Sequence, residues 1–165
     1  MRTTARKRFK IGASALAFLF LTGQAWAGGY CASPEESAAL KIAALQQQLM
    51  VAALSCSETG SYNRFVIAYR TDLQRSDAVL QGYFLHSDPH GGVAAYHAYK
   101  TRLANKASLR SLHDIVSYCA DARAVFNAAL ARYGQPLAAL VSGQPAAIAI
   151  RDTECTNSRR VAGRQ

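Results

Sequence analysis

Residues 33–56 read SPEESAALKIAALQQQLMVAALSC, and this stretch indicates a long first helix. Ser33 can cap the helix, Pro34 suits its first position, and Glu36 stands where a capping box requires an acidic side chain. Apolar side chains then recur at helical spacing: Ile42, Leu45, Leu49, Ala52 and Cys56. We therefore expect a helix over residues 34–55.

Three further helices are expected downstream. Apolar stripes at helical spacing predict a helix over residues 62–85 and helical structure throughout 93–133. The stripe in the second segment changes phase between Ala107 and Leu112, and a single helix there would be about 60 Å long, too long for this domain. We therefore expect a break near Asn105–Ser108, with either residue as the new cap. The resulting helices would cover 92–106 and 108–133, and Leu137 to Val141 would add one or two helical turns.

The amino terminus has the order of a secretory signal peptide. Five basic residues between Arg2 and Lys10 precede an uncharged apolar run from Ile11 to Leu21, and Ala25-Trp26-Ala27 offers small residues to signal peptidase. The run is too short for a spanning helix, which needs about 20 apolar residues. We therefore expect a signal peptide over residues 1–27 that is cleaved near Ala27. A periplasmic or secreted protein with no transmembrane segment would follow.

The remaining chain should form a single helical domain over residues 28–155, with a flexible basic tail over 156–165. The whole chain has 19 basic and 10 acidic residues, a net charge of +9. Five basic residues lie in the expected signal, which leaves 14 minus 10, or +4. Composition therefore gives little support to a nucleic-acid partner, and we expect none.

Four cysteines lie beyond the expected signal: Cys31, Cys56, Cys119 and Cys155. An even count in an exported chain favours disulfides, and the absence of a C-x-x-C pair disfavours a metal or thioredoxin-like site. Cys31 and Cys56 would stand at opposite ends of a helix about 33 Å long, so they cannot pair.

We expect the pairs Cys56–Cys119 and Cys31–Cys155, because these residues would meet at the two ends of a helical bundle. The crossed pairing, Cys31–Cys119 with Cys56–Cys155, stays open. The predicted fold is therefore all-α, an up-down four-helix bundle with an irregular C-terminal tail, stapled by two disulfides.

Three segments of the chain carry a family resemblance: 45–56 (LQQQLMVAALSC), 62–65 (YNRF), and 99–112 (YKTRLANKASLRSL) followed by Cys119. They resemble a family of short exported helical proteins of Gram-negative bacteria, over roughly residues 45–119. The matching positions are of core and capping type. The resemblance implies a periplasmic helical protein and transfers no catalytic or binding residue.

The sharpest local cluster of potential ligands is His86-x-Asp88-x-His90, with His97 one or two helical turns beyond. Imidazole and carboxylate side chains in a Gly-bearing loop could hold a divalent transition metal. However, Asp88-Pro89 and Gly91-Gly92 are also typical turn residues, and histidines in such a turn are often only solvated. We therefore expect no cofactor, with a divalent metal at these residues as the alternative.

A basic stripe is formed by Arg102, Lys106 and Arg110, which follow one another at four-residue spacing. The basic stripe could meet an anionic lipid headgroup, a polysaccharide or an acidic protein. The ordinary alternative is a solvated helix face, on which Arg110 and Asp114 form a surface pair worth about a few tenths of a kcal/mol.

The sequence contains no nucleophile elbow, no H-E-x-x-H and no Gly-rich phosphate loop, so we expect no enzymatic activity. The function that fits best is an exported interaction module that binds a protein or an envelope component. The alternative is a periplasmic metal-binding protein that uses His86, Asp88 and His90. A hydrolase whose site the sequence does not reveal is a third interpretation.

Overall fold

A computed structural model of the chain describes residues 31–142, and every regular element in that range is an α-helix. The helices are α1 (Pro34–Ser55), α2 (Thr59–Ala68), α3 (Arg70–Ser87), α4 (Gly92–His113), α5 (Ile115–Ala131) and α6 (Leu137–Ser142). The all-α class is confirmed for this part of the chain, with six helices where four were expected. The expected signal peptide, Cys155 and the basic tail lie outside the described residues.

Helix α1 begins at the capping box that its sequence predicts. The Ser33 hydroxyl accepts a hydrogen bond from the Glu36 N–H at 3.2 Å, and the Glu36 carboxylate accepts one from the Ser33 N–H at 2.7 Å. These two bonds satisfy backbone donors that a helix start leaves without partners. The predicted bounds of this helix, 34–55, are therefore confirmed.

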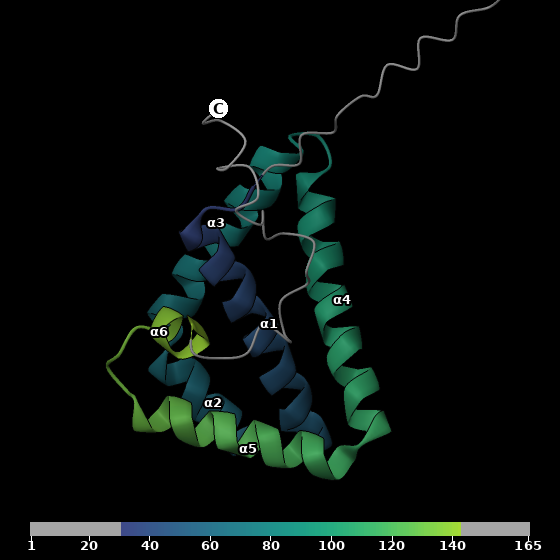
Figure 1. Cartoon of the computed structure of the whole chain (residues 1–165), viewed down its shortest axis with the longest axis vertical. Helices are drawn as coiled ribbons and strands as arrows, with labels where there is room; N and C mark the ends of the chain where they lie inside the picture. Colours follow the sequence, from purple (N-terminus) through teal and green to yellow (C-terminus); the bar gives the residue numbers. More distant parts are fainter. Residues whose placement is uncertain (1–30, 143–165) are drawn as a thin grey trace, which may run out of the picture.

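More than half of the residues of α1 are buried, and they lie on all sides of the helix. The reason is that each of the other five helices contacts α1. A helix that is apolar around its whole circumference is typical of a core position. In Figure 1, α3 and α4 run along α1, whereas α5 crosses the lower end of the molecule. The expected up-down four-helix arrangement is thus not confirmed.

Three clusters of buried side chains surround α1. One joins α1 to α2, α3, α5 and α6, and includes Leu45, Leu49, Phe65, Phe126 and Leu137. A second joins α1 to α3 and α4, and includes Leu40, Leu80, Tyr83, Tyr99 and Leu103. A third lies where the end of α1 meets α4 and α5, and includes Val51, Ala52, Ala107, Tyr118 and Ala122.

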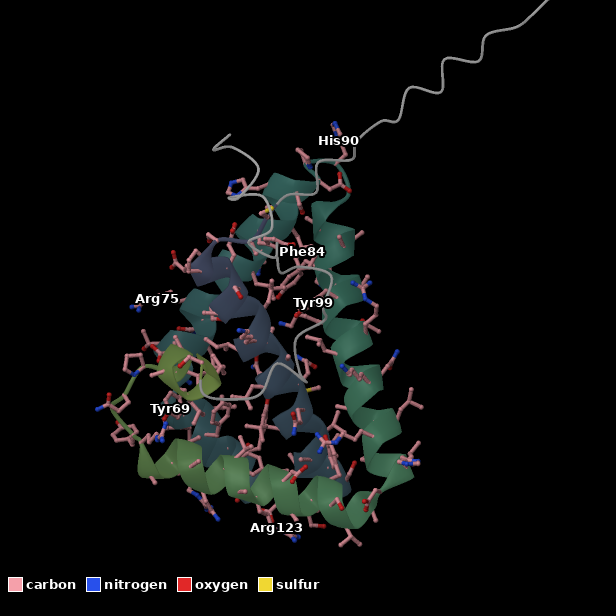
Figure 2. The ribbon with its side chains drawn as sticks, viewed as in Figure 1. Tyr69, Arg75, Phe84, His90, Tyr99 and Arg123 are labelled. Atoms are coloured by element: carbon pink, nitrogen blue, oxygen red, sulfur yellow. A yellow bond between two sulfur atoms is a disulfide. The ribbon has the colours of Figure 1, made fainter. Side chains whose placement is uncertain are left out.

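Buried tyrosine hydroxyls tie the helices together through backbone carbonyl oxygens. Tyr69 donates to Ala129 at 2.7 Å, Tyr99 to Leu40 at 3.1 Å, and Tyr118 to Gln48 at 2.8 Å. A buried hydroxyl without such a partner would be costly. Burial also raises the pKa of Tyr99 to about 12. Figure 2 shows Tyr99 on α4 and Phe84 on α3 beside α1; their ring centroids are 5.4 Å apart.

The expected helix over residues 62–85 is two helices, because the backbone departs from helical geometry at Tyr69. The Tyr69 side chain reaches from this junction to the end of α5, where its hydroxyl bonds the Ala129 carbonyl. The expected break near Asn105–Ser108 is wrong. Helix α4 continues to His113, and the chain turns at Asp114 instead. The last expected helical turn, Leu137 to Val141, is confirmed by α6.

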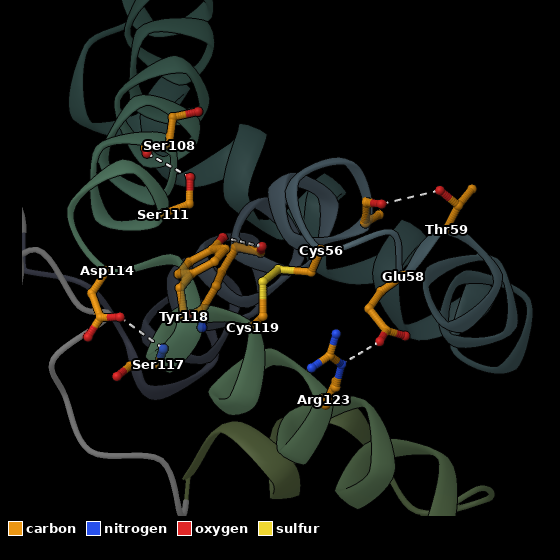
Figure 3. Close-up of a disulfide and its surroundings, with 12 residues drawn as sticks. Cys56, Glu58, Thr59, Ser108, Ser111, Asp114, Ser117, Tyr118, Cys119 and Arg123 are labelled. Carbon is orange, nitrogen blue, oxygen red and sulfur yellow. Dashed lines mark hydrogen bonds and ion pairs between the residues drawn. A yellow bond between two sulfur atoms is a disulfide. The ribbon is translucent and has the colours of Figure 1, made fainter.

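A disulfide joins Cys56, at the end of α1, to Cys119 on α5, with Cα atoms 5.6 Å apart (Figure 3). Arg123 lies beside it and donates from Nε to a Glu58 carboxylate oxygen at 2.7 Å, which links the same two regions of the chain. The predicted pair Cys56–Cys119 is confirmed, and it excludes the crossed pairing. The other expected pair, Cys31–Cys155, includes a residue outside the described range.

Candidate interaction surface

Helix α4 has an unusual charge distribution. No aspartate or glutamate occurs between Asp88 and Asp114, whereas Lys100, Arg102, Lys106 and Arg110 all lie on this helix. Helix α3, by comparison, carries both acidic and basic side chains. The outer side of α4 is therefore positively charged along its second half.

The basic stripe lies on one unbroken helix, because α4 extends to His113. Arg102, Lys106 and Arg110 are all exposed. Residues three or four apart are neighbours on a helix surface, so Leu109 and His113 lie on the same side as Arg102 and Lys106. The segment from Arg102 to His113 is about 16 Å long.

Arg110 makes two contacts on α5 that the sequence did not predict. Its guanidinium group forms an ion pair with Asp121 and lies 5.7 Å from the centre of the Tyr118 ring. The expected pair with Asp114 is wrong, because the Asp114 carboxylate accepts a hydrogen bond from the Ser117 N–H at 3.0 Å. Arg110 therefore connects the basic stripe to α5.

Lys100 points toward α3, away from the basic stripe. Its ammonium group donates to Asp77 at 2.9 Å and to the Tyr96 hydroxyl at 3.0 Å, while that hydroxyl donates to Asp77 at 2.7 Å. Partial burial raises the pKa of Asp77, but the hydrogen bonds from Tyr96 and Lys100 outweigh it and hold the pKa below its ordinary value. This polar cluster fixes α4 against α3.

An apolar surface lies at the junction of α4 and α5. Of nine large apolar side chains that are exposed within residues 31–142, four fall between positions 109 and 116. They are Leu109 (68% exposed), Leu112 (83%), Ile115 (44%) and Val116 (77%), and we call them the α4–α5 corner. Single exposed apolar residues are ordinary, whereas large contiguous apolar patches are typical of interaction sites.

The backbone at Asp114 brings the ends of α4 and α5 together. Asp114 departs from helical geometry (φ −149°, ψ 87°), so the chain changes direction between the two helices in a single residue. Its carboxylate caps α5 through the Ser117 N–H (Figure 3). The last turn of α4 and the first turn of α5 thus meet at the lower right edge of Figure 1.

The predicted metal ligands lie at the opposite end of α4. Asp88 accepts hydrogen bonds from the N–H groups of His90 (3.2 Å) and Gly91 (2.9 Å), so its carboxylate orders the turn. His90 is exposed at the top of Figure 2, and the His97 ring packs edge-on against Tyr96. His86 lies in the last turn of α3. Among the described residues, no three His, Cys, Asp or Glu side chains converge. The metal site stays a prediction.

A cavity of about 190 Å³ lies between α1, α3 and α6. Its walls are mainly apolar, and Glu35, Asp72 and Arg75 contribute charged groups. Asp72 already accepts a hydrogen bond from the Leu137 N–H at 2.7 Å, which holds the start of α6. Nothing in this lining selects a ligand class, so the α4–α5 corner is the stronger candidate site.

Comparison of the chain with protein-family models, curated proteins and solved structures found no match. The resemblance to short exported helical proteins therefore stays a prediction. Within residues 31–142, no helix is both long and apolar enough to cross a bilayer.

Proposed function

We propose that this protein is an exported, non-catalytic interaction module that docks on the cell envelope through the α4–α5 corner. The observation that carries this proposal is the cluster of four exposed aliphatic side chains around Asp114, next to the basic stripe. Exposure of such a surface to water is unfavourable in free energy, and its burial against a partner is favourable.

Two further observations support export. The amino-terminal sequence has the order of a signal peptide, and the Cys56–Cys119 disulfide is of a kind that persists in oxidising compartments. The periplasm or the extracellular space provides such conditions.

The test is fractionation of expressing cells after osmotic release of the periplasm. We expect the wild-type protein to sediment with the envelope and the Leu112→Asp/Val116→Asp variant to appear in the soluble fraction. The matched control is Ile67→Asp/Leu54→Asp, which adds the same charges at two other exposed apolar positions (74% and 79%). The proposal fails if the wild type is wholly soluble, or if the two variants distribute alike.

Native mass spectrometry of the wild-type protein, purified from whichever fraction contains it, tests the metal alternative in the same preparation. A divalent-metal adduct that disappears in His86→Ala/His90→Ala would favour metal binding. A bare protein mass would weigh against it.

A further inference from the structure

We propose, on the basis of the docking function above, that the α4–α5 corner and the basic stripe bind the surface of an anionic phospholipid bilayer. The partner is thus a lipid surface, and the protein binds it peripherally. Charge, the type of apolar side chain and the position of the surface in the fold favour this partner.

Charge favours an anionic partner. Helix α4 carries four cationic side chains and no carboxylate, and Arg102, Lys106 and Arg110 are exposed along it. Basic residues beside a membrane are attracted to the negative potential of anionic lipids. Asp121 pairs with Arg110 and offsets the charge of that one side chain, and the Asp114 carboxylate caps α5.

The apolar side chains favour a bilayer over a protein. Leu109, Leu112, Ile115 and Val116 are all aliphatic. Energetically dominant positions in protein interfaces are enriched in Trp, Tyr and Arg, and Leu and Val are under-represented there. Aliphatic side chains that flank a basic helix face are typical of surfaces that enter the boundary between headgroups and acyl chains.

The position of the surface fits a flat partner. The α4–α5 corner lies at an edge of the molecule, where two helix ends meet (Figure 1). Lys106 and Leu109 are three residues apart on one face of α4. The corner can therefore enter the interface while the basic stripe lies along the headgroups.

The test uses protein purified from the periplasm, whose intact mass establishes whether residues 1–27 have been removed. Sedimentation with vesicles of phosphatidylethanolamine and phosphatidylglycerol is compared with sedimentation with phosphatidylcholine vesicles. We expect binding to the anionic vesicles alone, and weaker binding as the salt concentration rises.

A matched pair of variants assigns the binding to this surface. Arg102→Gln/Leu112→Ser removes one cation and one aliphatic side chain from it. Arg70→Gln/Ile67→Ser makes the same changes at exposed positions on α2 and α3. We expect the first variant to lower the partition coefficient at least tenfold, of which about fivefold comes from the lost charge. The second variant should leave the partition coefficient within about twofold of the wild-type value.

A tryptophan provides a direct readout of insertion. The only tryptophan of the chain is Trp26, inside the expected signal, so Leu112→Trp adds a single fluorophore to the mature protein. Its emission should shift to the blue with anionic vesicles, whereas emission from the Ile67→Trp control should not change.

The lipid proposal is overturned if the wild type does not bind anionic vesicles. It is also overturned if Arg102→Gln/Leu112→Ser and Arg70→Gln/Ile67→Ser bind them equally well. If vesicle binding is absent but Leu112→Asp/Val116→Asp still releases the protein from the envelope, the partner is a protein or polysaccharide and the docking function stands. If neither assay responds to the α4–α5 corner, both proposals fail.

Discussion

The Tyr118 hydroxyl on α5 donates a hydrogen bond to the Gln48 carbonyl oxygen on α1, at 2.8 Å. The Tyr118 side chain is completely buried, and burial raises its pKa. The bond lies beside the Cys56–Cys119 disulfide, where α5 crosses α1 (Figure 3). The crossing of these two helices is therefore held by a covalent bond and by a specific polar contact.

Replacement of Tyr118 by phenylalanine should lower the free energy of unfolding by about 1 kcal/mol, because the ring is kept and only the hydrogen bond is lost. Chemical denaturation gives the value. The control is Tyr133→Phe, since Tyr133 is 74% exposed and its change should be within about 0.5 kcal/mol. Equal effects of the two variants would show that the Gln48 contact contributes nothing.

Two glycines should respond to alanine in opposite directions. A Cβ atom at Gly92 would stand 2.5 Å from the Phe84 carbonyl oxygen and 2.8 Å from the Leu85 Cα, so Gly92→Ala should destabilise the protein by about 1–3 kcal/mol. A Cβ at Gly82, within α3, would meet nothing within 4 Å, so Gly82→Ala should stabilise by about 0.5–1 kcal/mol. Thermal unfolding of both variants checks the pair, and stabilisation by Gly92→Ala would contradict the close approach of α4 to α3.

Removal of the Cys56–Cys119 disulfide should lower the free energy of unfolding by more than Gly92→Ala does. The bond closes a sequence separation of 63 residues, and loss of that constraint on the unfolded chain corresponds to about 4 kcal/mol. The Cys56→Ala/Cys119→Ala variant, unfolded in guanidinium without reductant, measures it. A midpoint equal to that of the wild type would show that the crossing of α1 and α5 needs no covalent bond.

The polar cluster of Asp77, Tyr96 and Lys100 should make the free energy of unfolding sensitive to acid. The pKa of Asp77 is lowered in the folded protein, so its stabilising effect is present above the ordinary aspartate pKa and is lost as the pH falls through the folded value. The pKa of Lys100 is raised in spite of burial, by Tyr96 and Asp77, so its effect is lost only when the pH rises through its folded value.

The free energy of unfolding should therefore fall less steeply for Asp77→Asn than for the wild type as the pH is lowered from neutral to about pH 3. Tyr96→Phe, which removes one donor from the carboxylate, should lie between them. Parallel curves for all three proteins would show that Asp77 has the same proton affinity in the folded and unfolded chain.

The first helix could be predicted to the residue, because a capping box at Ser33 and Glu36 is a local signal that tertiary packing did not override. The junction at Tyr69 could not. The buried residues Phe65, Tyr69 and Leu73 follow one another at helical spacing through this junction. The periodicity alone therefore predicts one continuous helix. The signal of the break is a long-range contact, from Tyr69 to Ala129 on α5.

The α4–α5 corner was missed for a different reason. The change of phase between Ala107 and Leu112 predicts a break near Asn105–Ser108 only if Leu112 faces the core, as apolar side chains usually do; Leu112 is exposed, and the chain turns at Asp114 instead. A weaker signal was present in Asp114, which stands three residues before the N–H group it caps at Ser117. The four-residue spacing of the basic stripe is a correct signal of one helix face, but the expected break near Asn105–Ser108 would divide the stripe, and only the continuous helix α4 joins its three residues.

The burial of α1 on all sides has a consequence for how the chain acquires its structure. This helix is complete at Ser55, but its cover is finished only when Phe126 and Leu137 arrive from α5 and α6. Its contacts therefore span most of the described sequence, and such non-local contacts slow folding. A chain truncated before α5 would expose the apolar side chains of α1 to self-association, so the α4–α5 corner should be studied on the intact fold.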